Sequence, residues 1–187
     1  MIQATPPFIP IPDGWQKVSP NPWLICSPPS LDRTPREGTL SLSSIDPALE
    51  DYFTIQPGTK RFADPIRCLL LLWHDHWEEA HEIAQALKSQ DGSLLHAIIH
   101  RREPDYWNCK YWLRAAGNHP AYLELATMLK DGSQDASSSW IRGGKFDCVA
   151  FTESVELALQ NSTPFILSQL QSIQALETCA VLTGWEV

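Results

Sequence analysis

The chain has 187 residues, of which 43% are hydrophobic and 19% charged, and its formal net charge is −8. A chain of this length and composition usually forms one globular domain. Because it is acidic and has no basic cluster, and because no apolar run reaches the roughly 20 residues of a membrane helix, we expect neither a nucleic-acid nor a membrane partner.

The cysteines and the N-terminus bear on the cellular compartment. The five cysteines are dispersed and form no C-x-x-C pair, which argues against zinc-ribbon and redox-dithiol sites. The first residues carry neither the basic nor the apolar segment typical of a secretion signal. Together these features predict reduced thiols in a cytoplasmic protein.

Residues 1–63 form a proline-rich N-terminal arm that holds eleven of the fifteen prolines. Proline fixes φ and removes a backbone donor, so we expect a mostly irregular segment. The arm also contains Trp15, Trp23 and other apolar residues, too many for a disordered tail, so it should pack on the core. Within it we expect a short helix over 45–53 and, as a weak candidate, a strand over 39–43.

From residue 64 the pattern changes to helices with recognisable ends, so residues 64–187 should form a helical domain. Aspartate, serine, threonine and proline mark helix starts, whereas glycine marks helix ends. The fold class is therefore all-α, an irregular helical bundle or stacked helical hairpins. The expected helices begin near Asp64, Asp75, Ser93, Asp105, Pro120, Asp147 and Thr163, and end near Trp73, Ser89, Arg102, Gly117, Asp131, Gln160 and Leu182.

Two of these boundaries carry specific expectations. Asp75 with Glu78 three residues later has the spacing of a capping box. Residues 131–145 are rich in glycine and serine, so we expect a loop there, with Arg142-Gly143-Gly144-Lys145 as a flexible segment.

All six histidines lie between residues 74 and 119, and four of the eight tryptophans lie between residues 73 and 112. His96 and His100 are four residues apart, so a helix places both imidazoles on one face, where they can chelate one metal ion. If the preceding helix runs antiparallel, it brings His81 to the same level. Three imidazoles with a nearby carboxylate satisfy a zinc or iron site, but the H-x-x-x-H pattern is common and no H-E-x-x-H is present.

The same residues permit chemistry without a metal. His81 or His100 could act as a general base, oriented by Glu103 or Asp105, so His81, His100 and Glu103 are the candidate catalytic residues. His74 and His76 flank Asp75, which is typical of a carboxylate-oriented histidine. We favour a structural interpretation for that triplet, in which Asp75 caps a helix.

A second group of residues is suited to an anionic or sugar-like ligand. Arginine and lysine bind carboxylates or phosphates, and tryptophan and tyrosine can line a pocket. The alternatives are an internal ion network for the two adjacent arginines and a solvated helix face for the rest. The candidate ligand-binding residues are Arg101, Arg102, Trp107, Lys110, Tyr111 and Arg114.

One combination of segments spans residues 67–182: Leu70–Asp75, Ala80–Gln85, Asp91–Ser93 with His96, His100–Tyr106 with Asn108, Lys110–Trp112, Gly117 with His119 and Pro120, and more weakly Phe146-Asp147 with Phe151, and Leu170-Gln171. This combination resembles a family of uncharacterised, mostly bacterial helical proteins. Where that family would have Trp-Asp-Pro, this chain has Phe146-Asp147-Cys148, which affects the packing of one helix start. The resemblance supports the helical fold and the location of a site, and it implies no reaction.

Two hypotheses about function remain open. The first is a small-molecule-binding or enzymatic site at residues 74–119, with a divalent metal as a possible cofactor and a small anion as a possible ligand. The second is a helical scaffold that binds other proteins or a second copy of itself, with structural histidines. A site requires the histidines to converge, whereas a scaffold leaves them dispersed.

Overall fold

The computed structural model describes residues 29–34, 36–131, 139–161 and 164–183. Within these ranges all regular elements are helices apart from one two-stranded hairpin, so the all-α prediction is confirmed. The elements are α2 (Leu42–Ile55), η1 (Pro57–Phe62), α3 (Ala63–Trp73), α4 (Trp77–Ala86), α5 (Gln90–Arg102), α6 (Tyr106–Ala116), α7 (Ala121–Asp131), β1 (Ile141–Arg142), β2 (Lys145–Phe146), α8 (Cys148–Asn161) and α9 (Pro164–Thr183).

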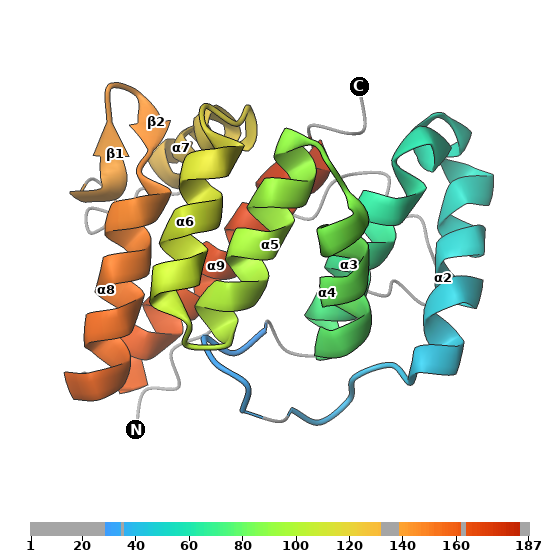
Figure 1. Cartoon of the computed structure of the whole chain (residues 1–187), viewed down its shortest axis with the longest axis horizontal. Coiled ribbons are helices and arrows are strands. Elements are labelled where there is room, and N and C mark those ends of the chain that lie inside the picture. Colours follow the sequence, from blue (N-terminus) through green and yellow to red (C-terminus); the bar gives the residue numbers. More distant parts are fainter. Residues whose placement is uncertain (1–28, 35, 132–138, 162–163, 184–187) are drawn as a thin grey trace.

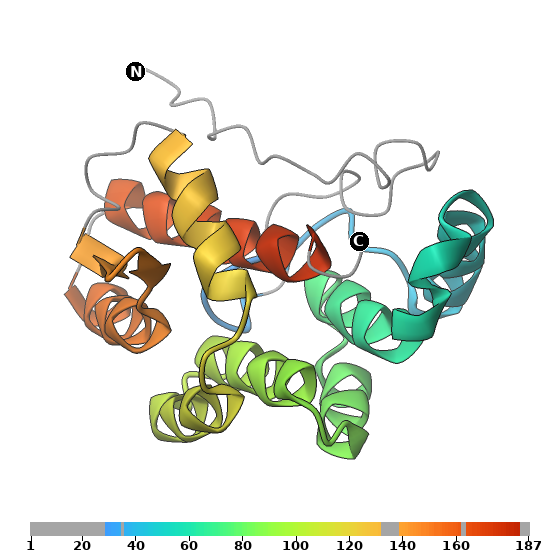
Figure 2. The ribbon, with the colours of Figure 1, turned by 90° about the horizontal axis from the view of Figure 1, so that it is seen from above.

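Consecutive helices from α3 to α6 pack against each other. Helix α3 packs on α4, α4 on α5, and α5 on α6 (Figure 1). Helix α9 runs behind α5 and α6 in that view, and Figure 2 shows α7 crossing it, with α8 at its side. Helices α4, α5 and α6 therefore form one face of the molecule, and α9 lies behind them.

Helices α3 and α5 contribute long buried apolar runs to the core. The run from Cys68 to Trp73 on α3 is buried along its whole length, as are Leu94, Leu95, Ile98 and Ile99 on α5. Burial of such aliphatic side chains is the main favourable term in folding. Among the helices of the described ranges, none combines the length and the apolar character that crossing a bilayer requires.

The described part of the N-terminal arm is irregular over 29–34 and 36–41 and helical afterwards. Helix α2 contains the predicted short helix over 45–53 and extends it at both ends. The weak strand prediction over 39–43 is wrong, because α2 already begins at Leu42. Trp15 and Trp23 lie outside the described residues.

Asp75 does not cap a helix, so the capping-box prediction is wrong. Helix α4 begins at Trp77, and no side-chain hydrogen bond caps it. Asp75 has a φ of 66°, a left-handed conformation that aspartate tolerates better than most residues. Its carboxylate instead accepts hydrogen bonds from Arg36 Nε at 3.0 Å and Arg102 Nη2 at 2.7 Å. The guanidinium groups of Arg36 and Arg102 therefore occupy the carboxylate of Asp75 in place of the backbone N–H groups at the start of α4.

The start of α5 also differs from the prediction. Ser89, not Ser93, is the N-cap, and its Oγ accepts a hydrogen bond from the Gly92 N–H at 3.1 Å. The chain turns so tightly here that a Cβ at Gly92 would lie 2.5 Å from the Leu87 carbonyl oxygen. Glycine at position 92 therefore permits the close approach of α4 to α5, rather than marking a turn between them.

Later helix ends follow the sequence more closely. Asp105 caps α6 by accepting from the Asn108 N–H at 3.2 Å, and Asp147 caps α8 by accepting from the Ala150 N–H at 2.9 Å. The predicted loop over 131–145 is corrected in its last part, where β1 and β2 pair antiparallel. Gly143 and Gly144 have φ values of 58° and 80°, which a two-residue hairpin turn requires.

Candidate metal centre

His96 and His100 lie one turn apart on α5, with exposed fractions of 3% and 7%. Because residues four apart share one helix face, the two rings are nearly parallel, with planes 9° apart and centroids 5.1 Å apart. In the structure this face is covered by side chains from α4 and α6.

His81 on α4 supplies a third imidazole. Its Nε2 lies 2.9 Å from Nε2 of His96, and its ring centroid lies 5.3 Å from that of His100. The short connection between α4 and α5 folds the first helix back along the second, which is the arrangement that the sequence required for His81 to reach the other two histidines. The three predicted histidines therefore converge.

The separations of the ring nitrogens suit one metal ion. One potential ligand nitrogen from each imidazole lies within 4.8 Å of the other two. Nitrogens bound to zinc lie about 2.0–2.1 Å from the metal, so in a tetrahedral site they are about 3.3 Å apart. The observed separations bracket that value, and small side-chain rotations would place all three nitrogens on one zinc ion. When no metal is bound, the 2.9 Å contact is a hydrogen bond between two imidazoles, one donating and one accepting.

Glu103 orients the ring of His100 through a hydrogen bond. The Nδ1–H of His100 donates to Glu103 Oε2 at 3.0 Å. That hydrogen bond lowers the pKa of the Glu103 carboxyl, which desolvation by itself would raise, and the Arg33 charge lowers it further. A carboxylate on Nδ1 fixes the tautomer in which Nε2 carries the lone pair, the arrangement common behind metal-bound histidines. The contact therefore supports the orienting role predicted for Glu103.

His96 is the most deeply buried of the three histidines. Its ring stacks on Trp112 of α6, with centroids 4.2 Å apart and planes 8° apart. Desolvation lowers the pKa of His96 to about 4, and the neighbouring His81 and His100 lower it too. The imidazole is therefore neutral at neutral pH, the form that binds metal. Its Nδ1 has no hydrogen-bond partner among the described residues.

Asn108 also contacts the cluster; the sequence placed it in the segments that carry the resemblance but not among the candidate site residues. Its Nδ2 lies 3.2 Å from Nε2 of His100. Asn108 and Trp112 are four residues apart on α6, and they face His100 and His96, which are four apart on α5. That matched spacing was the available signal, but it becomes visible only once α5 and α6 are known to pack together.

Arg101 and Arg102 lie in internal ion pairs and are almost fully buried. Arg101 forms a bidentate pair with Glu177 of α9, and its Nε donates to Thr152 Oγ1 at 3.0 Å. The structure therefore gives Arg101 the internal network weighed above as an alternative to ligand binding.

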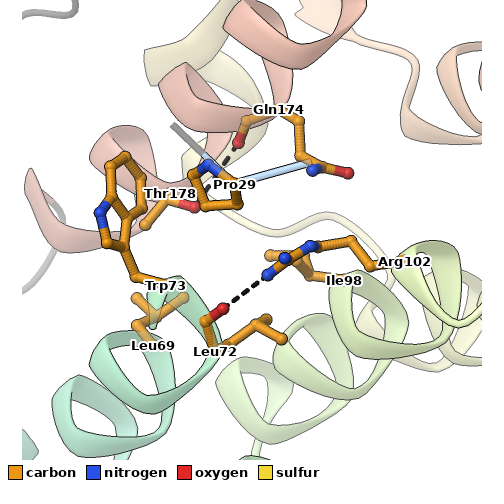
Figure 3. Close-up of a pocket in the computed structure, with 8 residues that line it drawn as sticks. All are labelled: Pro29, Leu69, Leu72, Trp73, Ile98, Arg102, Gln174 and Thr178. Carbon is orange, nitrogen blue, oxygen red and sulfur yellow. Dashed lines mark hydrogen bonds between the residues drawn. The ribbon is translucent and has the colours of Figure 1, made fainter. Parts of the chain in front are cut away.

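Arg102 is held in a similar way beside a small pocket (Figure 3). Its guanidinium donates to the carbonyl oxygens of Ser30 and Leu72 and to Asp75, at 2.9, 2.5 and 2.7 Å. It also lies over the Trp77 ring, 4.1 Å from the centroid. All three of its nitrogens thus have protein partners, so the guanidinium is engaged within the core.

The remaining predicted ligand residues lie on the outer side of α6. Trp107 and Tyr111 are 77% and 52% exposed, with ring centroids 6.3 Å apart. Lys110 pairs with Glu156 of α8 at 3.4 Å, and Arg114 is exposed. Tyr111 touches Trp112, with centroids 5.3 Å apart, so this surface begins next to the ring that covers His96.

His74 and His76 form hydrogen bonds with the N-terminal arm and are not part of the histidine cluster. The Leu40 N–H donates to Nδ1 of His74 at 3.0 Å, and Nε2 of His76 lies 2.8 Å from the Leu40 carbonyl oxygen. A structural role was expected for both histidines, and the structure pairs both with the backbone of Leu40.

Comparisons of the chain with protein-family models, with curated proteins and with solved structures found no match. The resemblance noted from the sequence therefore stays a prediction, and the function has to be argued from the cluster itself.

Proposed function

We propose that this protein binds a zinc ion through His81, His96 and His100. The observation that carries the proposal is the convergence of the three imidazoles, with one nitrogen of each within 4.8 Å of the others. Burial of His96 supports it, because it keeps that imidazole neutral, and the carboxylate behind His100 supports it, because it orients that ring.

Zinc fits the donor set better than the other metals considered. Magnesium and calcium prefer oxygen ligands, whereas this group offers nitrogen. Non-haem iron commonly uses two histidines and a carboxylate, but the carboxylate of Glu103 is engaged by Nδ1 of His100. Three imidazoles suit tetrahedral zinc and leave one coordination position.

That remaining position indicates a class of chemistry. Three neutral imidazoles leave the charge of the zinc dication uncompensated, so a small anion or an acidified water is attracted to it. We therefore propose small-anion binding, with hydrolysis or hydration by zinc-bound water as the enzymatic form of the function. The attraction comes from the metal, since Arg101 and Arg102 are paired within the core.

The exposed Trp107 and Tyr111 favour a second candidate function, a contact with another protein or with a second copy of the chain. Large exposed aromatic side chains are enriched at such interfaces. Sedimentation of the wild type and of Trp107→Ala at several concentrations tests this candidate. Self-association that the substitution abolishes supports it, whereas a monomer at every concentration counts against a homo-oligomer.

We propose a cytoplasmic location for the protein, as its composition suggests. Cys68, Cys109 and Cys148 are free, buried thiols. Burial raises the pKa of each, so each thiol stays protonated and reacts poorly as a nucleophile. Fractionation of cells that express the chain tests this location.

The test of the zinc site uses protein purified without a histidine tag. Elemental analysis and zinc titration compare the wild type with His96→Ala/His100→Ala. We expect near-stoichiometric zinc in the wild type and none in the double variant. His119→Gln is the matched control, because His119 pairs with Asp91, 2.9 Å away, and belongs to no metal-ligand group of the described residues.

Two results would contradict the proposal. One is a wild-type protein that neither contains zinc nor takes it up at micromolar concentration. The other is equal zinc binding by the double variant, measured at a temperature where circular dichroism shows that both proteins are folded.

A further inference from the structure

We infer that Asn108 closes the zinc site by supplying its fourth ligand through Oδ1. This inference rests on the proposed zinc site and names the group that occupies its remaining position. It also changes what the site does, because a protein ligand there must be displaced before an anion or water can bind.

The position of the amide carries the argument. The terminal amide of Asn108 lies 3.2 Å from Nε2 of His100. Because Nδ1 of His100 is engaged by Glu103, Nε2 is the nitrogen left for the metal. Two ligand atoms on one tetrahedral zinc are about 3.3 Å apart. The amide therefore already lies at ligand–ligand distance from the nitrogen that binds the metal.

The chemistry of the amide permits the exchange. Its nitrogen and oxygen differ by a rotation of the side chain, and their assignment follows the hydrogen-bond network. Opposite a bare imidazole lone pair, the amide presents Nδ2 as a donor. Opposite a cation the same network favours Oδ1, because a carbonyl oxygen is a metal ligand and an N–H is not.

Neighbouring contacts fix Asn108 in this place. Its backbone N–H is held by Asp105 in the first turn of α6, and Trp112 on the same face stacks on His96. Both ends of the α5 histidine pair are thus covered by one face of α6. Zinc bound in this way connects three helices, α4, α5 and α6.

A neutral amide is a weaker zinc ligand than imidazole or carboxylate. Small anions should therefore displace Asn108, whereas the three histidines stay bound. The site is closed at rest and opens to a small monoanion, which is the ligand class that we assign to it.

The experiment uses the full chain loaded with cobalt(II), whose visible absorption reports coordination number, together with zinc affinities from competition titration. We expect Asn108→Ala to weaken zinc binding roughly tenfold, to shift the cobalt spectrum, and to bind thiocyanate more tightly than the wild type. Asn108→Asp should restore or strengthen zinc binding, because a carboxylate can take the same position. Asn118→Ala is the control, since Asn118 only accepts from Lys145 at 3.0 Å.

The outcomes separate this inference from the proposed function. If the wild type binds no metal, both fail. If the wild type binds zinc but Asn108→Ala leaves zinc affinity within twofold and the cobalt spectrum unchanged, Asn108 is not a ligand and only this inference is overturned. If Asn108→Asp behaves like Asn108→Ala, the effect is structural and the inference is again overturned.

Discussion

At the residue scale, burial sets the protonation of His96, one of the three clustered histidines. His96 is 3% exposed and stacked on Trp112, so water cannot solvate an imidazolium there. Two neighbouring imidazoles add to that penalty. The His96 imidazole is thus kept in the neutral form, which is the form that binds metal.

This burial predicts a pH dependence of the stability of the metal-free protein. The pKa of His96 falls from its usual 6.5 to about 4 on folding, so between these values the unfolded chain binds a proton that the folded chain does not. The free energy of unfolding should therefore decrease as pH falls from 6.5 to 4, by at most about 3 kcal/mol from this residue. Urea titrations with chelator at pH 7 and pH 5 measure it.

His96→Gln is the comparison for that measurement. The variant lacks the titrating group, so its loss of stability between pH 7 and pH 5 should be smaller than that of the wild type. An equal loss in both proteins would show that His96 does not titrate in this way.

At the element scale, helix starts decided several differences from the sequence prediction. Asp105 and Asp147 are caps, as predicted. Arg142 pairs with Oδ2 of Asp147 at 3.3 Å, which leaves Oδ1 to cap the helix. Asp75 has the same local pattern, but Arg36 and Arg102 take its oxygens. A local signature predicts a cap only when no distant charge offers a stronger contact.

The start of α5 gives a direct test. Ser89→Ala removes the hydrogen bond to the Gly92 N–H and should destabilise the protein by about 1 kcal/mol. Ser93→Ala, at the residue that the sequence favoured as the cap, should change stability by less, since its hydroxyl only donates to the Ser89 carbonyl. Thermal unfolding of both variants compares them, and a larger loss for Ser93→Ala would contradict the observed cap.

At the scale of the whole molecule, a buried ion pair joins α5 to α9. Arg101 of α5 and Glu177 of α9 are both almost completely buried, and Thr152 of α8 accepts from the same guanidinium. Buried charges are costly unless paired, so this contact favours one particular packing of α9 behind α5.

Breaking this pair from one side should be severe. Arg101→Met leaves Glu177 buried without its partner and should lower the free energy of unfolding by about 3–5 kcal/mol. Arg101→Met/Glu177→Leu removes both charges and should recover much of that loss. Urea unfolding of the two variants tests this, and a double variant less stable than the single one would show that the pair is not the cause.

The sequence by itself determined the all-α class, most helix positions in the second half of the chain and the three histidines that converge. Periodicity and helix-terminal residues are local signals, and the spacing of His96 and His100 is fixed by one helix. Only the tertiary structure decided that Arg101 and Arg102 are internal, that Asp75 binds arginines, and that Asn108 faces His100. Each of these depends on partners far along the chain or on another helix, such as Glu177 for Arg101, and local sequence carries no information about which distant charge or face will pack there.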